Sequence, residues 1–264
     1  MIKIRYLSDL HLEFGSGVSH PKRGKEDVVV LAGDISVGTK GIHWAQRVFA
    51  PTPVIYVLGN HEYYGENFDG LIVKAKEKAR DSNVHVLEND AVVVQGYRFL
   101  GCTLWSDFDI LGPERRAEGM EAAQQLLNDY LRIRQGPNGK TRTVLPEETR
   151  ARHLVSRQWL HDSIAASAEP VIVVTHHGPI IEASAPQYRG SLLSGAFTSD
   201  LRSLIKPPVR LWFYGHTHHN EDGVWNQVRV LANQRGYAQD DFMGFGWDNT
   251  IELATPHPKN RSPC

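Results

Sequence analysis

Five short segments that resemble β-strands each lead directly into polar side chains of the kinds that carry out chemistry. The continuous apolar run at residues 27–32, for example, indicates a strand that is buried on both faces. Open α/β sheets place their functional groups at the carboxyl ends of strands, so these ends are expected to form one site. The segments cover residues 2–7, 27–32, 53–58, 170–175 and 209–214, and the polar residues after them are Asp9, His11, Asp34, Asn60, His61, His176, His216 and His218.

The order of the other elements predicts a second sheet. Strands and helices alternate at first, whereas residues 84–103 give three short strands in succession, as in a β-meander. Gly59 is expected to let the chain turn sharply before Asn60. The remaining predictions are helices at 40–50, 66–81, 113–134, 146–164 and 197–205, a loop at 178–195, strands at 84–87, 91–95, 97–103, 228–231 and 250–253, and an irregular tail from residue 256.

No linker or internal repeat divides the sequence, so a single domain over residues 1–264 is predicted. Within it, residues 105–150 form a helix-rich insertion between strands, and such insertions often cap active sites. The apolar stripe of the 113–134 helix would then cover the site as a lid. The alternative is that this stripe only packs on the core.

The composition excludes several classes of function. Lys and Arg total 29 and Asp and Glu total 30, for a net charge of -1, so bulk binding to nucleic acid is not indicated. Residues 1–7 alternate apolar and basic side chains, which predicts a strand and not a signal peptide. The sequence contains no run of about 18 apolar residues, which is the length needed to span a membrane. With only Cys102 and Cys264, a cytoplasmic protein is the simplest interpretation.

The polar strand ends carry the donors of a metal site. Asp9 and His11 are two residues apart, as are His216 and His218, so each pair points the same way in an extended segment. The donors are oxygen and imidazole nitrogen without sulfur, which suits manganese, iron, zinc or magnesium. Seven such ligands are too many for one ion. Two ions that share one carboxylate would use them, and such a pair promotes displacement at phosphorus.

Taken in order, these motifs resemble those of the calcineurin-like metallophosphoesterase superfamily, in particular its compact bacterial members. The motifs are Asp9-Leu10-His11, Gly33-Asp34, Gly59-Asn60-His61-Glu62, His176 and Gly215-His216-Thr217-His218. The resemblance implies an α/β fold, a four-layer α/β/β/α sandwich of two mixed β-sheets with flanking helices. It places a dinuclear metal site at the carboxyl ends of the strands.

The resemblance also implies a role for each residue. Asp9, His11 and His218 would hold one ion, and Asn60, His176 and His216 would hold the other. Asp34 would bridge two divalent or trivalent ions, with Mn²⁺ expected first and Fe, Zn or Mg as alternatives. A hydroxide that bridges the ions would attack phosphorus, and His61 would act as general acid toward the departing oxygen.

Two departures from the superfamily bear on the substrate. The Gly33-Asp34 motif lacks the Asp-Arg-Gly ending of protein phosphatases, and Tyr63-Tyr64 follow Glu62, so a phosphoprotein substrate is not expected. The expectation is a phosphodiesterase for small or nucleotide-like substrates. The alternatives are a phosphomonoesterase, a hydrolase of nucleotide or lipid-linked pyrophosphate bonds, a nuclease, and a non-catalytic scaffold.

Candidate substrate residues lie in the loops that follow the strands. Arginine can bind phosphate with two hydrogen bonds, and aromatic rings can stack on a base. Glu62 would either pair with His61 or cap the turn that follows it. The candidates for substrate contact are His177, Tyr188, Arg189 and Arg235.

Overall fold

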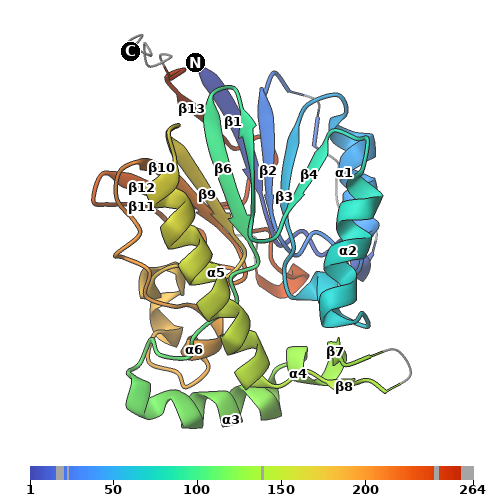
Figure 1. Ribbon diagram of the computed structural model, residues 1–264, viewed down its shortest axis with the longest axis vertical. Helices are drawn as coiled ribbons and strands as arrows, with labels where there is room; N and C mark the ends of the chain where they lie inside the picture. The colour runs from blue at the N-terminus through green and yellow to red at the C-terminus, as the bar shows by residue number, and fades with distance from the viewer. Residues whose placement is uncertain (16–20, 23, 138–139, 241–243, 257–264) are drawn as a thin grey trace.

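Two β-sheets lie face to face in the computed structural model, with helices against both outer surfaces (Figure 1). The structure describes residues 1–15, 21–22, 24–137, 140–240 and 244–256. Residues 257–264, part of the predicted irregular tail, lie outside these ranges. No helix in the described ranges is both long enough and apolar enough to cross a bilayer.

The first sheet is built mainly from the N-terminal part of the chain. Only the β13–β1 pair is antiparallel, and the other neighbours run parallel. Helices α1 (Lys40–Phe49) and α2 (Phe68–Ala79) cover its outer face, where Ile42 and Leu71 join Val29 in one apolar cluster. In order across the sheet, the strands are β13 (Thr250–Leu253), β1 (Ile2–Leu7), β2 (Val28–Ala32), β3 (Val54–Val57) and β4 (Val84–Leu87).

The second sheet has a parallel centre and antiparallel edges. The long helix α5 (Pro146–Ala166) packs on its outer face through Leu160, which clusters with Cys102 and Trp212. In order across the sheet, the strands are β11 (Asp222–Trp225), β12 (Val228–Ala232), β10 (Val209–Tyr214), β9 (Val171–Thr175), β6 (Tyr97–Cys102) and β5 (Asp90–Val94).

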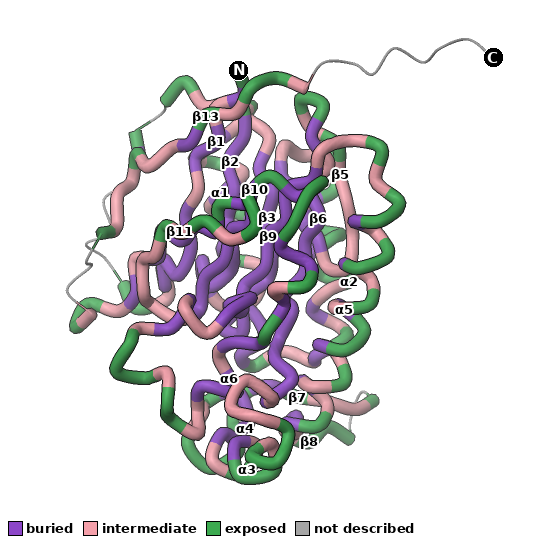
Figure 2. Tube along the Cα trace, turned by 90° about the vertical axis from the view of Figure 1, so that its left-hand side faces the viewer, coloured by how far each residue is buried: buried purple, intermediate pink, exposed green. Residues whose placement is uncertain are grey.

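The inner faces of the two sheets form the central core. Val28 and Val30 of β2 point inward and meet Phe99 and Phe213 of the second sheet. Val29 lies between them in sequence and faces the helices instead, because side chains alternate along a strand. Figure 2 shows the central strands as mostly buried, and every residue of β2, β3 and β9 is buried. The predicted four-layer sandwich of two mixed sheets is therefore confirmed.

Residues 105–150 gather at one end of the sandwich, below the carboxyl ends of the strands (Figure 1). The prediction of one helix over 113–134 is wrong. The chain is extended at Leu127, and this break brings Asp129 to Tyr64, whose hydroxyl donates to it at 2.7 Å. The elements there are η3 (Pro113–Arg115), α3 (Arg116–Leu126), α4 (Asp129–Arg132), β7 (Arg134–Gln135) and β8 (Arg142–Thr143).

Two further differences lie in the second half of the chain. A helix at 197–205 is wrong, because α6 (Ser194–Phe197) ends where Thr198 forms an extended bridge with Gly178. Strand β11 was not expected, since it is a short edge strand without a buried residue. The remaining short turns are η1 (Leu12–Phe14), η2 (His61–Tyr63), η4 (Ile181–Ala183), η5 (Pro186–Tyr188) and η6 (Ala238–Asp240).

Candidate metal centre

All eight polar residues at the strand ends converge on one place. They follow β1, β2, β3, β9 and β10, whose carboxyl ends meet at one end of the two sheets. Asn60 joins them through its Oδ1, which lies 2.9 Å from His176 Nε2. Three groups have ligand atoms within 4.8 Å of one another: Asp9, His11 and His218; His11, Asp34 and His61; and Asp34, His176 and His216.

Five residues of this centre have a left-handed backbone conformation, with positive φ, which residues other than glycine seldom adopt. Left-handed residues cost roughly 1–3 kcal/mol each and cluster at functional sites. Backbone hydrogen bonds hold them here: Asp9 N donates to Gly33 O, and His11 N donates to Asp34 O, both at 3.0 Å. The residues and their φ angles are Asp9 at 52°, His11 at 47°, Asp34 at 53°, His216 at 72° and His218 at 48°.

Gly59 is required for close approach and not for the sharp turn expected from the sequence. Its φ lies outside the left-handed range, in contrast to Gly33 at 88°. A Cβ atom at Gly59 would overlap Asp34 Oδ1 and would lie 2.8 Å from His176 Cε1. The absence of a side chain therefore lets the loops after β2, β3 and β9 pack against one another.

In the group of Asp9, His11 and His218, two imidazole nitrogens face each other. The Nε2 atoms of His11 and His218 are 3.1 Å apart, and Asp9 Oδ1 lies 3.5 Å from His218 Nε2. Each ring also has a carboxylate near its Nδ1, with Glu13 at 3.2 Å from His11 and Asp240 at 2.6 Å from His218. Carboxylates in this position leave Nε2 as the ligand atom.

Two acceptor atoms are also brought together beside Asp34. His176 Nδ1 donates to Ala32 O at 2.9 Å, so its Nε2 carries a lone pair toward Asn60 Oδ1. The other end of the Asn60 amide is fixed, because Nδ2 donates to Asp129 Oδ1 at 2.8 Å. Two lone pairs at this distance repel each other unless a cation lies between or beside them.

The donor set fits divalent cations. His216 Nε2 is buried and has no hydrogen-bond partner among the described residues. Burial lowers the pKa of His176 to about 4 and lowers the pKa of His216 well below its usual range, so both rings are neutral ligands. Burial also raises the pKa of Asp34, and the nearby carboxylates of Glu62 and Asp9 raise it further. A cation would relieve this repulsion between buried acids.

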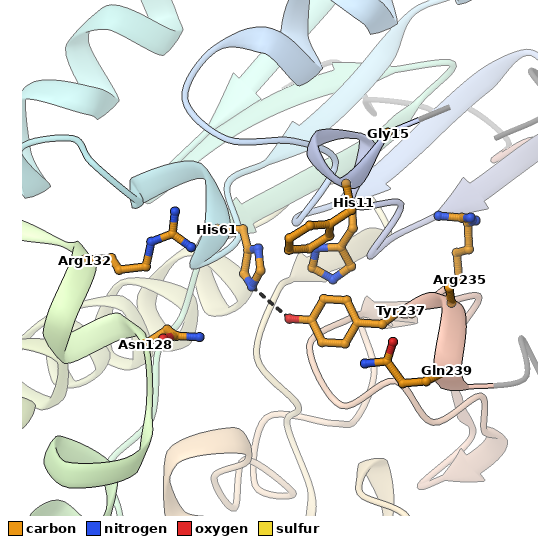
Figure 3. Close-up of a pocket in the computed structure, with 11 residues that line it drawn as sticks. His11, Gly15, His61, Asn128, Arg132, Arg235, Tyr237 and Gln239 are labelled. Atoms are coloured by element: carbon orange, nitrogen blue, oxygen red, sulfur yellow. Dashed lines mark hydrogen bonds between the residues drawn. The ribbon is translucent and has the colours of Figure 1, made fainter. Parts of the chain in front are cut away.

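His61 lies at the edge of the centre between two other side chains. Its Nδ1 is 2.8 Å from Glu13 Oε1, its Nε2 is 3.0 Å from the Tyr237 hydroxyl, and Nε2 is 3.9 Å from Asp34 Oδ2 (Figure 3). Burial opposes ionisation of Glu13, but hydrogen bonds with His11 and His61 outweigh it and lower its pKa to about 2. Glu13 is therefore an anion that fixes the orientation of the His61 ring.

Two cavities adjoin the centre. The first, the metal cleft, has a volume of about 300 Å³ and is lined by Asp34, Asn60, His216 and His218 together with Tyr188 and residues 126–129. The second, which we name the arginine cavity, has a volume of about 540 Å³ (Figure 3). It is lined by His11, Phe14, Gly15, His61, Asn128, Arg132, Arg235, Gly236, Tyr237, Ala238 and Gln239.

The four candidate substrate residues are placed differently. Tyr188 lines the metal cleft, and Arg235 lines the arginine cavity. His177 is buried behind His216, with ring centroids 4.1 Å apart, and its Nδ1 lies 3.2 Å from Thr103 O. Arg189 donates to the backbone carbonyls of Ser184 and Glu182. Neither His177 nor Arg189 is among the described residues that line these two cavities.

Sequence reasoning missed three acids that support the centre. Glu13 has a signal, because it continues the two-residue spacing of Asp9 and His11. Asp129 and Asp240 have none, since each meets its partner only through the tertiary fold.

Comparisons with known proteins show which sequences and folds this chain resembles. The chain matches the family model of calcineurin-like phosphoesterases over residues 3–220. It is 28% identical to an uncharacterised protein of Acanthamoeba polyphaga mimivirus over 90% of this chain and 92% of that protein. The phosphopantetheinyl hydrolase PptH of Mycobacterium tuberculosis has a similar fold, with a TM-score of 0.69 and 18% identity, over 99% of this chain and 98% of that one. A dimetal phosphatase from Danio rerio has a TM-score of 0.47 and 15% identity, over 88% and 87%.

The family model spans most of the chain and every residue of the centre from Asp9 to His218. The resemblance noted in the sequence is thus confirmed. Membership of this family implies divalent metal ions, and the groups of Asp and His side chains described above fit them. The chain therefore belongs to the calcineurin-like phosphoesterase family and is a metal-dependent phosphoester hydrolase.

Proposed function

We propose that the protein hydrolyses phosphodiesters of small or nucleotide-like substrates and uses two metal ions, with Mn²⁺ as the first candidate. One observation carries the proposal: Asp34 belongs both to the group with His176 and His216 and to the group with His11 and His61. A carboxylate shared between adjacent ligand groups is what a two-metal phosphoesterase requires.

The ligands divide into two sets around Asp34. Asp9, His11 and His218 would hold one ion, and Asn60, His176 and His216 would hold the other, in keeping with the short distances within each set. When bound, the ions would lower the pKa of a water molecule and neutralise charge that develops on the phosphoryl oxygens.

His61 would donate the proton that the departing oxygen needs. The Glu13 carboxylate lies 2.8 Å from Nδ1, and it turns Nε2 toward the Tyr237 hydroxyl at the border of the two cavities. An alcohol that leaves on this side would take its proton from Nε2. Tyr237 would position that oxygen, since its hydroxyl already occupies a hydrogen-bonding place next to Nε2.

The organisation of the chain supports a covered site. We place all 264 residues in one domain, with residues 105–150 as a cap over the metal cleft, because Leu126, Leu127 and Asp129 form part of its wall. We also place the enzyme in the cytoplasm, in agreement with the buried free thiol of Cys102.

The test is a substrate panel on purified protein reconstituted with Mn²⁺, Fe²⁺, Zn²⁺ or Mg²⁺. It compares bis(p-nitrophenyl) phosphate with p-nitrophenyl phosphate. We expect the diester to have the higher kcat/KM. A clear preference for the monoester, or no hydrolysis with any of these ions, would overturn the proposal.

Three variants separate the roles of the residues. Asp34→Ala and His216→Ala should lose both bound metal and activity. His61→Ala should keep its metal and turn over slowly, by about 100-fold or more for diesters with poor leaving groups. The matched control is His161→Ala, because His161 is exposed on α5 and pairs with its neighbour Asp162. Full activity of His61→Ala on such a diester would exclude its role as the acid.

A further inference from the structure

The arginine cavity begins where a leaving group would depart. It shares His61, Asn128 and Tyr237 with the metal cleft, so the two cavities meet at the His61 Nε2 and Tyr237 hydroxyl contact. A phosphodiester held in the cleft would have its departing oxygen at this border. The rest of its leaving group would then extend into the arginine cavity.

The charge of this cavity is positive, although the chain as a whole has a net charge of -1. Its described lining holds two arginines and no carboxylate, whereas the metal cleft is lined by three aspartates. Figure 3 shows Arg132 and Arg235 on opposite sides of the His61 and Tyr237 pair. An anionic group on the substrate is the complement of such a wall.

Arg132 is the cation best placed to receive that anion. Its guanidinium lies 4.7 Å from the centroid of the Tyr64 ring, which fixes its direction. No carboxylate among the described residues lies within ion-pair distance of it, whereas Arg116 on the neighbouring helix pairs with Asp109. Arginine binds phosphate through two parallel hydrogen bonds.

The cavity also has an aromatic surface. Phe14 lines it, and 65% of its surface is exposed. Its ring lies 5.6 Å from that of Tyr237, edge to face. Exposed rings of this kind offer a stacking platform for a flat ligand such as a nucleobase.

We propose that the arginine cavity binds an alcohol leaving group that is itself a nucleotide, with its terminal phosphate on Arg132 and its base against Phe14. The proposal rests on the phosphodiesterase function above and names its substrate class as short nucleotides with a terminal phosphate. A bond forms from water oxygen to phosphorus, the bond from phosphorus to the sugar oxygen breaks, and the His61 Nε2 proton moves to that oxygen.

Two dinucleotides test the phosphate contact. The adenylyl dinucleotide pApA has a 5′-phosphate and ApA lacks it. When the bond from phosphorus to the 3′ oxygen breaks, the leaving groups are AMP and adenosine, which differ only in that phosphate. We expect kcat/KM to be about 10-fold or more higher for pApA, as a charge-assisted hydrogen bond would give. Arg132→Met should bring this ratio close to one, and Arg132→Lys should give an intermediate ratio.

The matched control is Arg134→Met, which removes the same charge two residues away. Arg134 is exposed on β7 and is not among the residues that line either cavity. In this variant, the ratio of kcat/KM for pApA to kcat/KM for ApA should equal that of the natural chain. An unchanged ratio in Arg132→Met, or an equal loss for both dinucleotides, would overturn the assignment.

Calorimetric titration gives a readout that does not depend on turnover. The metal-loaded protein should bind AMP about 10-fold or more tightly than Arg132→Met does. Phe14→Leu should weaken the binding of AMP but not the binding of ribose 5-phosphate. If the protein cleaved bis(p-nitrophenyl) phosphate but did not prefer pApA over ApA, the cavity assignment alone would be refuted. Arg132-dependent AMP binding without any hydrolysis would sink the phosphodiesterase function and leave the cavity assignment standing.

Discussion

The backbone N–H of Asp34 donates to Glu62 Oε2 at 2.9 Å, which joins the loop after β2 to the loop after β3. Gly59 N donates to the same oxygen at 2.8 Å. The other oxygen accepts from Ile35 N at 2.9 Å and from the Tyr56 hydroxyl at 2.7 Å. Glu62 is therefore an acceptor for the strained backbone around Asp34, and not a partner of the His61 side chain.

Replacing Glu62 by alanine should loosen the metal centre from within. Four buried N–H groups, those of Asp34, Ile35, Ser36 and Gly59, would lose their acceptor. Each costs about 1–3 kcal/mol, so unfolding should become easier by at least about 4 kcal/mol. Bound metal should fall as well, because the position of Asp34 depends on these bonds. Denaturant unfolding and metal analysis by mass spectrometry measure the two effects.

The control for that prediction is Glu66→Ala. Glu66 pairs with Lys74 at the surface, and such pairs contribute about 0–1 kcal/mol. If Glu62→Ala resembled this control in both stability and metal content, the bracing role of Glu62 would be refuted.

Glu13→Gln should slow the enzyme in the same way as loss of the acid. Replacing the carboxylate by an amide weakens the hydrogen bond to Nδ1 that orients the His61 ring. At saturating metal we expect kcat to fall about 10- to 100-fold for alkyl leaving groups, and less for p-nitrophenolate. The dependence of rate on leaving-group pKa is the measurement.

A double variant makes that prediction sharper. If Glu13 acts through His61, then adding Glu13→Gln to His61→Ala should lower kcat little further, because Glu13 would have no effect once the His61 ring is gone. Fully multiplicative losses in the double variant would show that Glu13 acts by another route, such as through His11.

Asp129→Leu should weaken one of the two metal positions. Asp129 Oδ1 accepts from Asn60 Nδ2 at 2.8 Å and thereby keeps Asn60 Oδ1 on the side of His176. Without it the amide can rotate, and the loss of such supporting contacts commonly lowers metal affinity 10- to 100-fold. Titration with Mn²⁺ should show one weakened step, and Asp129→Asn, which retains an acceptor, should show a smaller change. Identical affinities in all three proteins would contradict the proposed contact.

Glu88 provides a test in the pH dependence of stability. Burial raises the pKa of Glu88, although Thr103 donates to its carboxylate from N at 2.8 Å and from Oγ1 at 2.7 Å. The folded state therefore binds the proton more tightly than the unfolded state, and stability falls as pH rises above the ordinary glutamate value. Glu88→Gln should remove this fall. The free energy of unfolding of the variant, minus that of the natural chain, should therefore grow with pH and then level off.

Denaturant unfolding of both proteins between pH 4 and 8 measures that difference. Comparing the two at each pH cancels the titration of every other group. A difference that stays constant across the range would show that Glu88 has an ordinary pKa in the folded protein.

The sequence was sufficient for the framework of the site. Parallel strands of one sheet bring their carboxyl ends together, so Asp9 and Asp34 had to lie close once β1 and β2 were recognised, and so did His176 and His216 after β9 and β10. Asp9 and His11 also both reach the centre, but through left-handed backbone beyond β1 and not through the extended segment that the two-residue rule assumes. The strand-end rule holds within one sheet, whereas the approach of the two sheets at this centre depends on the rest of the fold.

The supporting contacts could not be predicted, because they depend on where insertions dock. Asp129 is 69 residues from Asn60, and nothing in its neighbourhood marks it as a partner. The extended backbone at Leu127 places Asp129 beside Asn60, and it also ends α3, so the prediction of a single helix is wrong. Arg189 met the chemical criteria for phosphate binding, yet its guanidinium is occupied by the carbonyls of its own loop.

The four-residue helix α4 contacts both halves of the site. Its first residue, Asp129, fixes a ligand amide, and its last residue, Arg132, points into the arginine cavity. A change that shifts this helix to admit a different leaving group also displaces the support of the metal position. For this chain, substrate range and metal affinity are therefore coupled traits, and variants selected for a new substrate should be screened for their metal requirement as well.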